Sequence, residues 1–298
     1  MKKFLSLALL SAVLMSTFAH ANRILPVRSF SEKMMLSTPA PAAAQKVVYY
    51  GGPVIANVKV MAVFWGSSID ATIQKQIGGF YSTTTDSTYF DWLKEYNTGS
   101  KAVDGRAGTN QSIGRGSYIG SVTITPSIAK TSINDTDIQA ELDLQIAKGV
   151  LPKADSNTLY MIYFPGGVSI TIDNQTSCTA FCAYHNGFAS KTHGNVFYGV
   201  MPDMTSGACA FGCGFAAAFD NVTEVSSHEL IEAVTDPFPT PGSNPTFPQA
   251  WNTTDGNEVG DLCAGNATQL TSKGLSYNLQ QEYDNTISGC TSGPFQSP

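Results

Sequence analysis

Residues 221–237 read NVTEVSSHELIEAVTDP, and this stretch predicts the helix around which the rest of the fold is organised. Asn221, followed three residues later by Glu224, fits a capping box, in which two side chains satisfy free backbone groups at a helix start. Pro237 cannot continue a helix, because it lacks the backbone N–H that the next hydrogen bond needs. We therefore expect a central helix over residues 221–236.

The same helix carries a pattern that is typical of a metal site. His228 and Glu232 are four residues apart, so their side chains project from one helix face and can reach one cation. Zinc accepts both imidazole nitrogen and carboxylate oxygen. Glu229 lies about 100° further round the helix axis and one residue along it. The alternative to a metal site is that His228, Glu229 and Glu232 lie on an ordinary solvated helix face.

Acidic residues gather in and after this helix. Seven of the 23 Asp and Glu residues fall between Glu224 and Asp261, although the whole chain is only 13% charged. Asp236 stands at the expected helix end, and residues 255–261 read DGNEVGD just before Cys263. This second segment is also compatible with an oxygen-rich calcium loop, although it lacks the residue order of an EF-hand.

These two segments resemble the active site of the zincin metallopeptidases. The helix has His-Glu-x-x-Glu where those enzymes have His-Glu-x-x-His, and Asn257-Glu258 resembles their downstream Asn-Glu segment. The resemblance covers about a tenth of the chain, with one ligand altered. It implies zinc ligands at His228, Glu232 and Glu258, a general base at Glu229, and ligand-orienting carboxylates at Asp236 and Asp261.

Composition excludes several other classes of protein. Acidic residues outnumber basic ones by 23 to 17, which excludes nucleic-acid binding through a basic surface. Low charge together with 10% aromatic residues excludes a disordered chain. The sequence contains no Gly-x-Ser-x-Gly motif, which is the pattern that would indicate a serine hydrolase.

The N-terminus predicts export. Lys2 and Lys3 precede an apolar run over residues 4–18, and Ala19-His20-Ala21 is a small-x-small cleavage site. We expect a signal peptide over residues 1–21, with an uncleaved anchor helix as the alternative. No membrane span is expected after cleavage. A flexible Pro/Ala-rich leader is predicted over residues 22–46.

Six cysteines follow the predicted signal peptide, which in an exported protein indicates disulfides. Two Cys-x-x-x-Cys repeats suggest pairing within each repeat. We therefore expect the pairs Cys178–Cys182, Cys209–Cys213 and Cys263–Cys290. A four-cysteine zinc site in the two repeats is the rival interpretation.

Hydrophobic patterning predicts one α/β domain over residues 47–298, a mixed sheet with flanking helices. Strands are expected over residues 54–65, 119–125, 158–164, 195–201 and 276–283. Helices are expected over residues 68–81, 87–96 and 134–150, the last capped by Asn134.

His185 lies three residues after Cys182 and two before Gly187. A disulfide at Cys182 could bring this histidine close to the site, as a ligand or an acid–base group. The alternative is an ordinary loop residue, which is also the simplest interpretation of His193.

A set of short motifs resembles the phosphate-induced/EXORDIUM family of secreted proteins over roughly residues 48–292. The motifs are Gly51-Gly52-Pro53-Val54, Cys178-x-x-x-Cys182-x-x-His185-x-Gly187, Cys209-x-x-x-Cys213, Thr235-Asp236-Pro237-Phe238, and Glu258 ahead of Cys263 with a terminal Cys290. The resemblance implies an extracellular or cell-wall-associated protein with disulfides and no settled enzymatic activity. His228, Glu229 and Glu232 stand where we expect the plant members to carry apolar or small residues.

Two functions follow as hypotheses. The first is a secreted metal-dependent hydrolase of the zincin type, monomeric, with Zn²⁺ as cofactor and a protein or peptide as substrate. The second is a non-catalytic, EXORDIUM-like binding or signalling protein with structural Ca²⁺.

Overall fold

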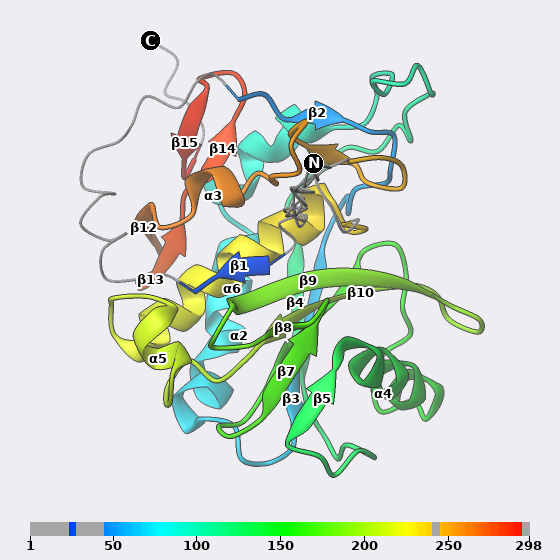
Figure 1. Ribbon diagram of the computed structural model, residues 1–298. Helices are drawn as coiled ribbons and strands as arrows, with labels where there is room; N and C mark the ends of the chain where they lie inside the picture. The colour runs from blue at the N-terminus through cyan, green and yellow to red at the C-terminus, as the bar shows by residue number, and fades with distance from the viewer. Residues whose placement is uncertain (1–23, 28–44, 240–244, 294–298) are drawn as a thin grey trace, which may run out of the picture.

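A six-stranded mixed sheet lies at the centre of the computed structural model, which describes residues 24–27, 45–239 and 245–293 (Figure 1). From one edge to the other its strands are β1 (Ile24–Pro26), β9 (Phe181–Ser190), β10 (Gly194–Met201), β6 (Thr158–Tyr163), β3 (Lys59–Trp65) and β4 (Ser117–Ile124). Strands β10, β6, β3 and β4 are parallel, whereas β9 runs antiparallel to β10 and β1 antiparallel to β9. The expected mixed α/β architecture is confirmed.

Helices and smaller sheets surround this sheet. The helices are α2 (Ala71–Thr85), α3 (Thr88–Asp91), α4 (Asp135–Ala147), α5 (Cys209–Gly212) and α6 (Ala218–Thr235), with 3-10 turns η1 (Trp92–Tyr96) and η2 (Asp261–Cys263). One small sheet contains β5 (Ser132–Asn134), β7 (Ser169–Ile172) and β8 (Gln175–Thr176). The paired strands are β2 (Val48–Tyr49) with β11 (Trp251–Asn252), β12 (Ala267–Ser272) with β13 (Leu275–Gln280), and β14 (Glu282–Asp284) with β15 (Gly289–Thr291).

The central strands are apolar on both faces, because both faces of the sheet are covered. In β3, Val60, Ala62 and Phe64 belong to the core on the side of α2 and α6. Met61 and Val63 point the other way, into the core on the side of α4. This period of two residues is the alternation of a strand, with an apolar residue at every position from Val60 onward.

Helix α6 begins earlier than the sequence predicts. It starts at Ala218 rather than at Asn221, and no side chain caps it. The expected capping box is wrong: the Asn221 side chain folds back to accept a hydrogen bond from the backbone of Ala216, and the Glu224 carboxylate accepts one from Asn278. The helix ends at Thr235, as the following Asp-Pro sequence predicts. By contrast, Asn134 caps the start of α4 as predicted, and Asp137 completes a capping box with it.

Strands β9 and β1 are the two strands of the central sheet that the sequence did not predict. His185 lies on β9, so its interpretation as a loop residue is wrong. Ile24–Pro26 falls inside the expected flexible leader but pairs with β9 as an edge strand. The predicted signal peptide and most of the leader lie outside the described residues.

The disulfide pairing differs from the prediction at four of the six cysteines. Cys178 bonds to Cys209 and Cys182 to Cys213, each pair 31 residues apart, while Cys263 bonds to Cys290 as expected. On the single turn of α5, residues four apart project side by side rather than toward one another. Each repeat therefore bonds outward to the other, and the two bridges tie α5 to the start of β9. The four-cysteine zinc alternative is excluded by the same bonds.

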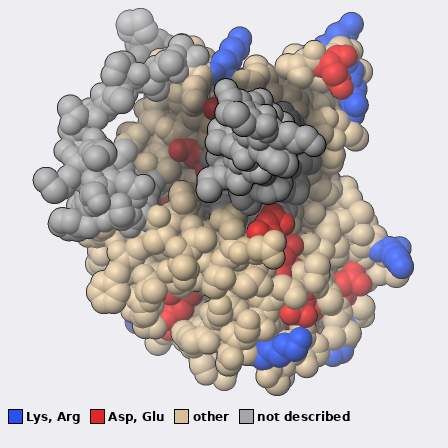
Figure 2. All heavy atoms as spheres, viewed as in Figure 1, with Lys and Arg blue, Asp and Glu red and all other residues tan. Residues whose placement is uncertain are grey.

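None of the helices in the described part of the chain combines the length and apolar character of a membrane span. The face shown in Figure 2 is largely uncharged, with the Lys and Arg side chains at its margins.

The disulfide pairing can be tested by tryptic digestion without reduction. Trypsin cleaves at Lys153, Lys191 and Lys273, which gives one peptide with Cys178 and Cys182, a second with Cys209, Cys213 and Cys263, and a third with Cys290. The observed bonds predict that mass spectrometry finds all three peptides joined until a reductant is added. A first peptide that separates from the other two without a reductant, with Cys178 bonded to Cys182, would contradict the structure.

Candidate metal centre

Helix α6 is buried along most of its length, and this places its acidic residues in the interior. Every residue from Asn221 to Thr235 except Glu224 is buried, because α6 packs against β9 and β10 on one side and against β13 on another (Figure 1). His228, Glu229 and Glu232 are each 0% exposed. The solvated-face interpretation of these residues is therefore wrong. A carboxylate in such a place needs a compensating charge, a proton or a metal ion.

His185 of β9 faces these acids from across the interface. Its Nε2 lies 3.0 Å from the backbone oxygen of Asp236, and its Nδ1 lies 3.4 Å from Glu229 Oε2. Because a carbonyl oxygen can only accept, Nε2 carries the hydrogen in this contact. In the neutral ring Nδ1 then holds a lone pair that points toward the acids. Metal-binding histidines are held in the same way, with the other ring nitrogen donating to a backbone carbonyl.

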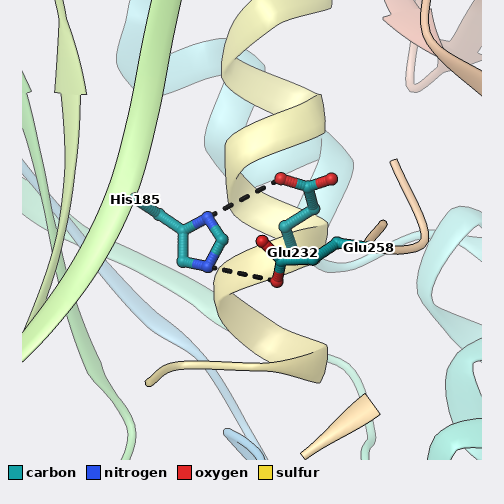
Figure 3. Close-up of side chains that lie close together, drawn as sticks. All are labelled: His185, Glu232 and Glu258. Carbon is teal, nitrogen blue, oxygen red and sulfur yellow. Dashed lines mark ion pairs between the residues drawn. The ribbon is translucent and has the colours of Figure 1, made fainter. Parts of the chain in front are cut away.

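One candidate ligand group consists of His185, Glu232 and Glu258. One ligand atom from each lies within 4.8 Å of the others, and Figure 3 shows both carboxylates on the same side of the His185 ring, one paired with each ring nitrogen. The ion-pair distances are 3.7 Å from His185 Nδ1 to Glu232 Oε2 and 3.5 Å from His185 Nε2 to Glu258 Oε1. The three residues come from β9, α6 and the segment before η2, so the fold brings them together from distant parts of the chain.

A second candidate group consists of His228, Glu232 and Asp261, again with ligand atoms within 4.8 Å of one another. His228 Nε2 lies 3.1 Å from Glu232 Oε2. The other ring nitrogen of His228 lies 2.8 Å from the side-chain amide nitrogen of Gln280, which leaves Nε2 as the atom that faces the carboxylate. Glu232 is thus common to both groups.

The carboxylates in this cluster are short of hydrogen-bond donors. Neither oxygen of Glu258 accepts a hydrogen bond, and Glu232 Oε2, Glu229 Oε1 and Asp236 Oδ2 accept none either. Buried polar atoms in native proteins are nearly always satisfied, so several such atoms in one place call for a missing partner. Mixed imidazole and carboxylate donors suit zinc better than calcium, which prefers oxygen alone. The residues therefore fit a divalent transition-metal ion such as Zn²⁺.

Burial also changes the proton affinity of the cluster. Desolvation raises the pKa of Glu232 to about 8 and that of Asp236 to about 7. It raises the pKa of Glu258 well above its usual value, and the charge of Glu232 adds to this. Burial lowers the pKa of His185, but the charge of Glu258 and the hydrogen bond to Glu229 outweigh it and raise that pKa well above the usual value. Protons thus partly neutralise the cluster, and a cation would compete with them.

The structure redistributes the residues that the sequence singled out. The expected ligands His228 and Glu258 fall in different groups, joined by Glu232, and His185 takes the place beside Glu258. Asp261 belongs to a ligand group, whereas Asp236 contributes its backbone oxygen to His185 and accepts from the backbone of Ala250.

Two other residues that the sequence singled out, Asp255 and His193, lie in neither ligand group. Asp255 accepts from Thr253 and is in neither ligand group, so among the acids of residues 255–261 only Glu258 and Asp261 belong to a ligand group. His193 lies in the turn between β9 and β10, and neither ligand group includes it.

Sequence reasoning missed Gln280 and Glu282 at this site. Glu282 is 0% exposed and lies 3.2 Å from the amide nitrogen of Gln280, which in turn contacts His228. An acid inside an otherwise strand-like segment was the available signal, since a buried strand rarely carries one without a partner.

No family model, no curated protein and no solved structure matches this chain. The resemblance to the EXORDIUM family therefore remains a hypothesis based on the motifs quoted above.

The raised pKa values predict an unusual pH dependence of stability for the metal-free protein. The folded chain holds protons on Glu232 and Asp236 up to about pH 8 and 7, whereas the unfolded chain loses them near pH 4. The stability contributed by these protons is complete below about pH 4 and is lost as the pH rises through the folded pKa values. In the presence of a chelator, we expect the melting temperature to fall by roughly 5 °C between pH 5 and 8, the effect of about 2 kcal/mol in a chain of this size.

Glu232→Gln should reduce this fall in melting temperature between pH 5 and 8, because it removes the carboxyl group with the higher of the two pKa values. A melting temperature that rises from pH 5 to 8 in the chelated wild-type protein would show that the carboxylates are ionised in the folded state.

Proposed function

We propose that this chain is a secreted metal-dependent hydrolase of the zincin type, with a peptide or protein as substrate. The observation that carries the proposal is the place of Glu229. Its carboxylate belongs to neither ligand group, yet it lies beside His185 and one residue from His228. A purely structural metal site has no need for such an extra acid, whereas a hydrolase needs a base next to its cation.

The surroundings of Glu229 suit a proton carrier. Oε2 faces His185 Nδ1 at 3.4 Å, whereas Oε1 accepts no hydrogen bond and is available to take a proton. Burial raises the pKa of Glu229 above its usual value, which moves it toward neutral pH, where a general base is most effective.

His185, Glu232 and Glu258 would hold the cation at this place, with Asp236 orienting His185 through its backbone oxygen. A bound divalent cation would polarise a substrate carbonyl and lower the pKa of a water molecule. Glu229 would accept the proton of that water at Oε1 and later deliver it to the leaving amine.

A cavity of about 470 Å³ is lined by Gln280, which contacts His228, but by none of the candidate ligands and not by Glu229. Leu25, Val225 and Phe215 give it an apolar lining. Three disulfides and the lack of a membrane-spanning helix in the described residues are compatible with a secreted protein.

Replacing the proposed base tests the hydrolase directly. Glu229→Gln should keep its metal, because Glu229 is in neither ligand group, but should lower kcat at least about 100-fold on fluorescently labelled casein. Metal content is measured by mass spectrometry on the same preparation. Asp220→Asn, on the first turn of the same helix, is the matched control and should keep full activity.

Two results would contradict the hydrolase. One is zinc-loaded wild-type protein that hydrolyses neither labelled casein nor a nitrophenyl ester above the rate of the buffer. The other is a Glu229→Gln variant that remains as active as the control.

A second candidate is a closed metal site in a non-catalytic, EXORDIUM-like binding or signalling protein. The depth of the cluster favours it: His185 and Glu232 are 0% exposed and Glu258 is 1% exposed. Structural metal sites are closed, whereas catalytic sites keep an open coordination position. In this case the metal would stabilise the packing of α6 against β9.

Reloading after chelation distinguishes the candidates. Chelation should lower the melting temperature for either candidate, because a ligand that binds only the folded state stabilises it. If Zn²⁺ restores both stability and hydrolysis, the hydrolase is supported. If Ca²⁺ restores stability better than Zn²⁺ and no hydrolysis follows, the closed-site candidate is supported.

A further inference from the structure

Glu232 lies between two histidines that come from different elements. Its Oε2 atom is 3.7 Å from His185 Nδ1 of β9 and 3.1 Å from His228 Nε2 of α6 itself. The two histidines fall in separate ligand groups, completed by Glu258 on one side and by Asp261 on the other. The cluster therefore has two candidate cation positions rather than one.

The distances within each group are those of neighbouring ligands on a metal ion. Metal–ligand bonds of about 2.1 Å at tetrahedral or octahedral angles put adjacent ligand atoms roughly 3.0–3.4 Å apart. The contacts of Glu232 Oε2 with His228 Nε2 at 3.1 Å and with His185 Nδ1 at 3.7 Å are near this spacing. This carboxylate oxygen accepts no hydrogen bond. Ligand atoms of a common ion lie at similar distances from one another.

The second position also has a rigid support. The backbone N–H of Asp261 donates to Glu232 Oε1 at 3.0 Å, which leaves Oε2 for the histidines. Gly260 packs so closely that a Cβ atom there would lie 2.7 Å from both Glu232 Oε1 and His228 Nδ1. The backbone at residues 260–261 thus holds both ligands in place, and only glycine fits there.

The charge of the cluster favours more than one cation. Five carboxylates that are at most 1% exposed lie in it, together with Asp261, which is partly exposed. They are Glu229, Glu232, Asp236, Glu258 and Glu282. Among the described residues, the ion pairs found for these carboxylates involve only His185 and His228. One divalent cation would balance two of these carboxylates, so the others need protons or a second cation.

We propose that the cluster is a two-cation centre in which Glu232 bridges an inner position, with His185 and Glu258, and an outer position, with His228 and Asp261. This inference deepens the proposed function and rests on its metal site. The inner ligands are all buried, whereas the partial exposure of Asp261 makes the outer position the one that exchanges with solvent.

Metal titration of the full chain tests the number of positions. Chelated protein is titrated with Zn²⁺ alone by isothermal calorimetry, and bound metal is counted by mass spectrometry after dialysis. We expect two equivalents for the wild type, one for Asp261→Asn and one for Glu258→Gln. Asp255→Asn is the matched control, since Asp255 lies six residues before Asp261 but in neither ligand group, and it should keep two equivalents.

Mn²⁺ alone gives a second readout that needs no variant. Two ions bridged by one carboxylate lie about 3.5–4 Å apart, so paramagnetic resonance of protein loaded with two equivalents should show an exchange-coupled pair. Asp261→Asn should show the six-line signal of an isolated ion.

A single equivalent in the wild type, an uncoupled Mn²⁺ signal, or two equivalents retained in Asp261→Asn would overturn the two-cation centre. If the wild type binds one equivalent of Zn²⁺ and its hydrolysis depends on Glu229, the two-cation centre is overturned but the proposed hydrolase is not. A chain that binds no metal would overturn both.

Discussion

The burial of helix α6 is the constraint on which the rest of the structure depends. A helix that carries His228, Glu229 and Glu232 on its inner side would ordinarily turn those residues to water, since ionised side chains are rarely buried without partners. Here the central sheet covers one side of the helix and the β12–β13 hairpin covers another, so the acidic side chains cannot reach solvent. Their desolvation, worth several kcal/mol for each ion, must be compensated by protons or by cations.

The fold supplies the compensating groups from far along the chain. His185 arrives on β9, which pairs with β10 and is tied to α5 by two disulfides at its start. The arrangement follows from the alternation of β9: Tyr184 and Asn186 point to Asp135 on α4, and His185 therefore points to α6. The alternation of a single strand thus puts the histidine into the acidic cluster.

Local sequence was enough for the parts of the fold that depend on local chemistry. The end of α6 follows from Asp236-Pro237, and the cap of α4 follows from Asn134 with Asp137. The start of α6 could not be predicted in this way, because its N-terminus at Ala217 has no capping side chain and the helix is held by packing instead. Tertiary burial decides such boundaries when capping signals are absent.

The candidate site was predictable only in part, for the same reason. The i, i+4 spacing identified His228 and Glu232, and the acidic segment identified Glu258 and Asp261. The partnership of His185 with Glu232, 47 residues apart in the numbering, depends on β9 lying across α6, and the polar residues of β9 hid its strand character. The disulfide pairing was predicted wrongly for a similar reason, since the spacing of each Cys-x-x-x-Cys repeat does not reveal which element faces it.

Whether divalent cations occupy the space around the Glu232 carboxylate can be measured on a crystal of zinc-soaked protein, with data collected on both sides of the zinc absorption edge. We expect anomalous peaks about 2.0–2.2 Å from an oxygen of Glu232. A map without such a peak, in which the cluster carboxylates are protonated and hydrogen-bonded to one another or to water, would contradict this expectation.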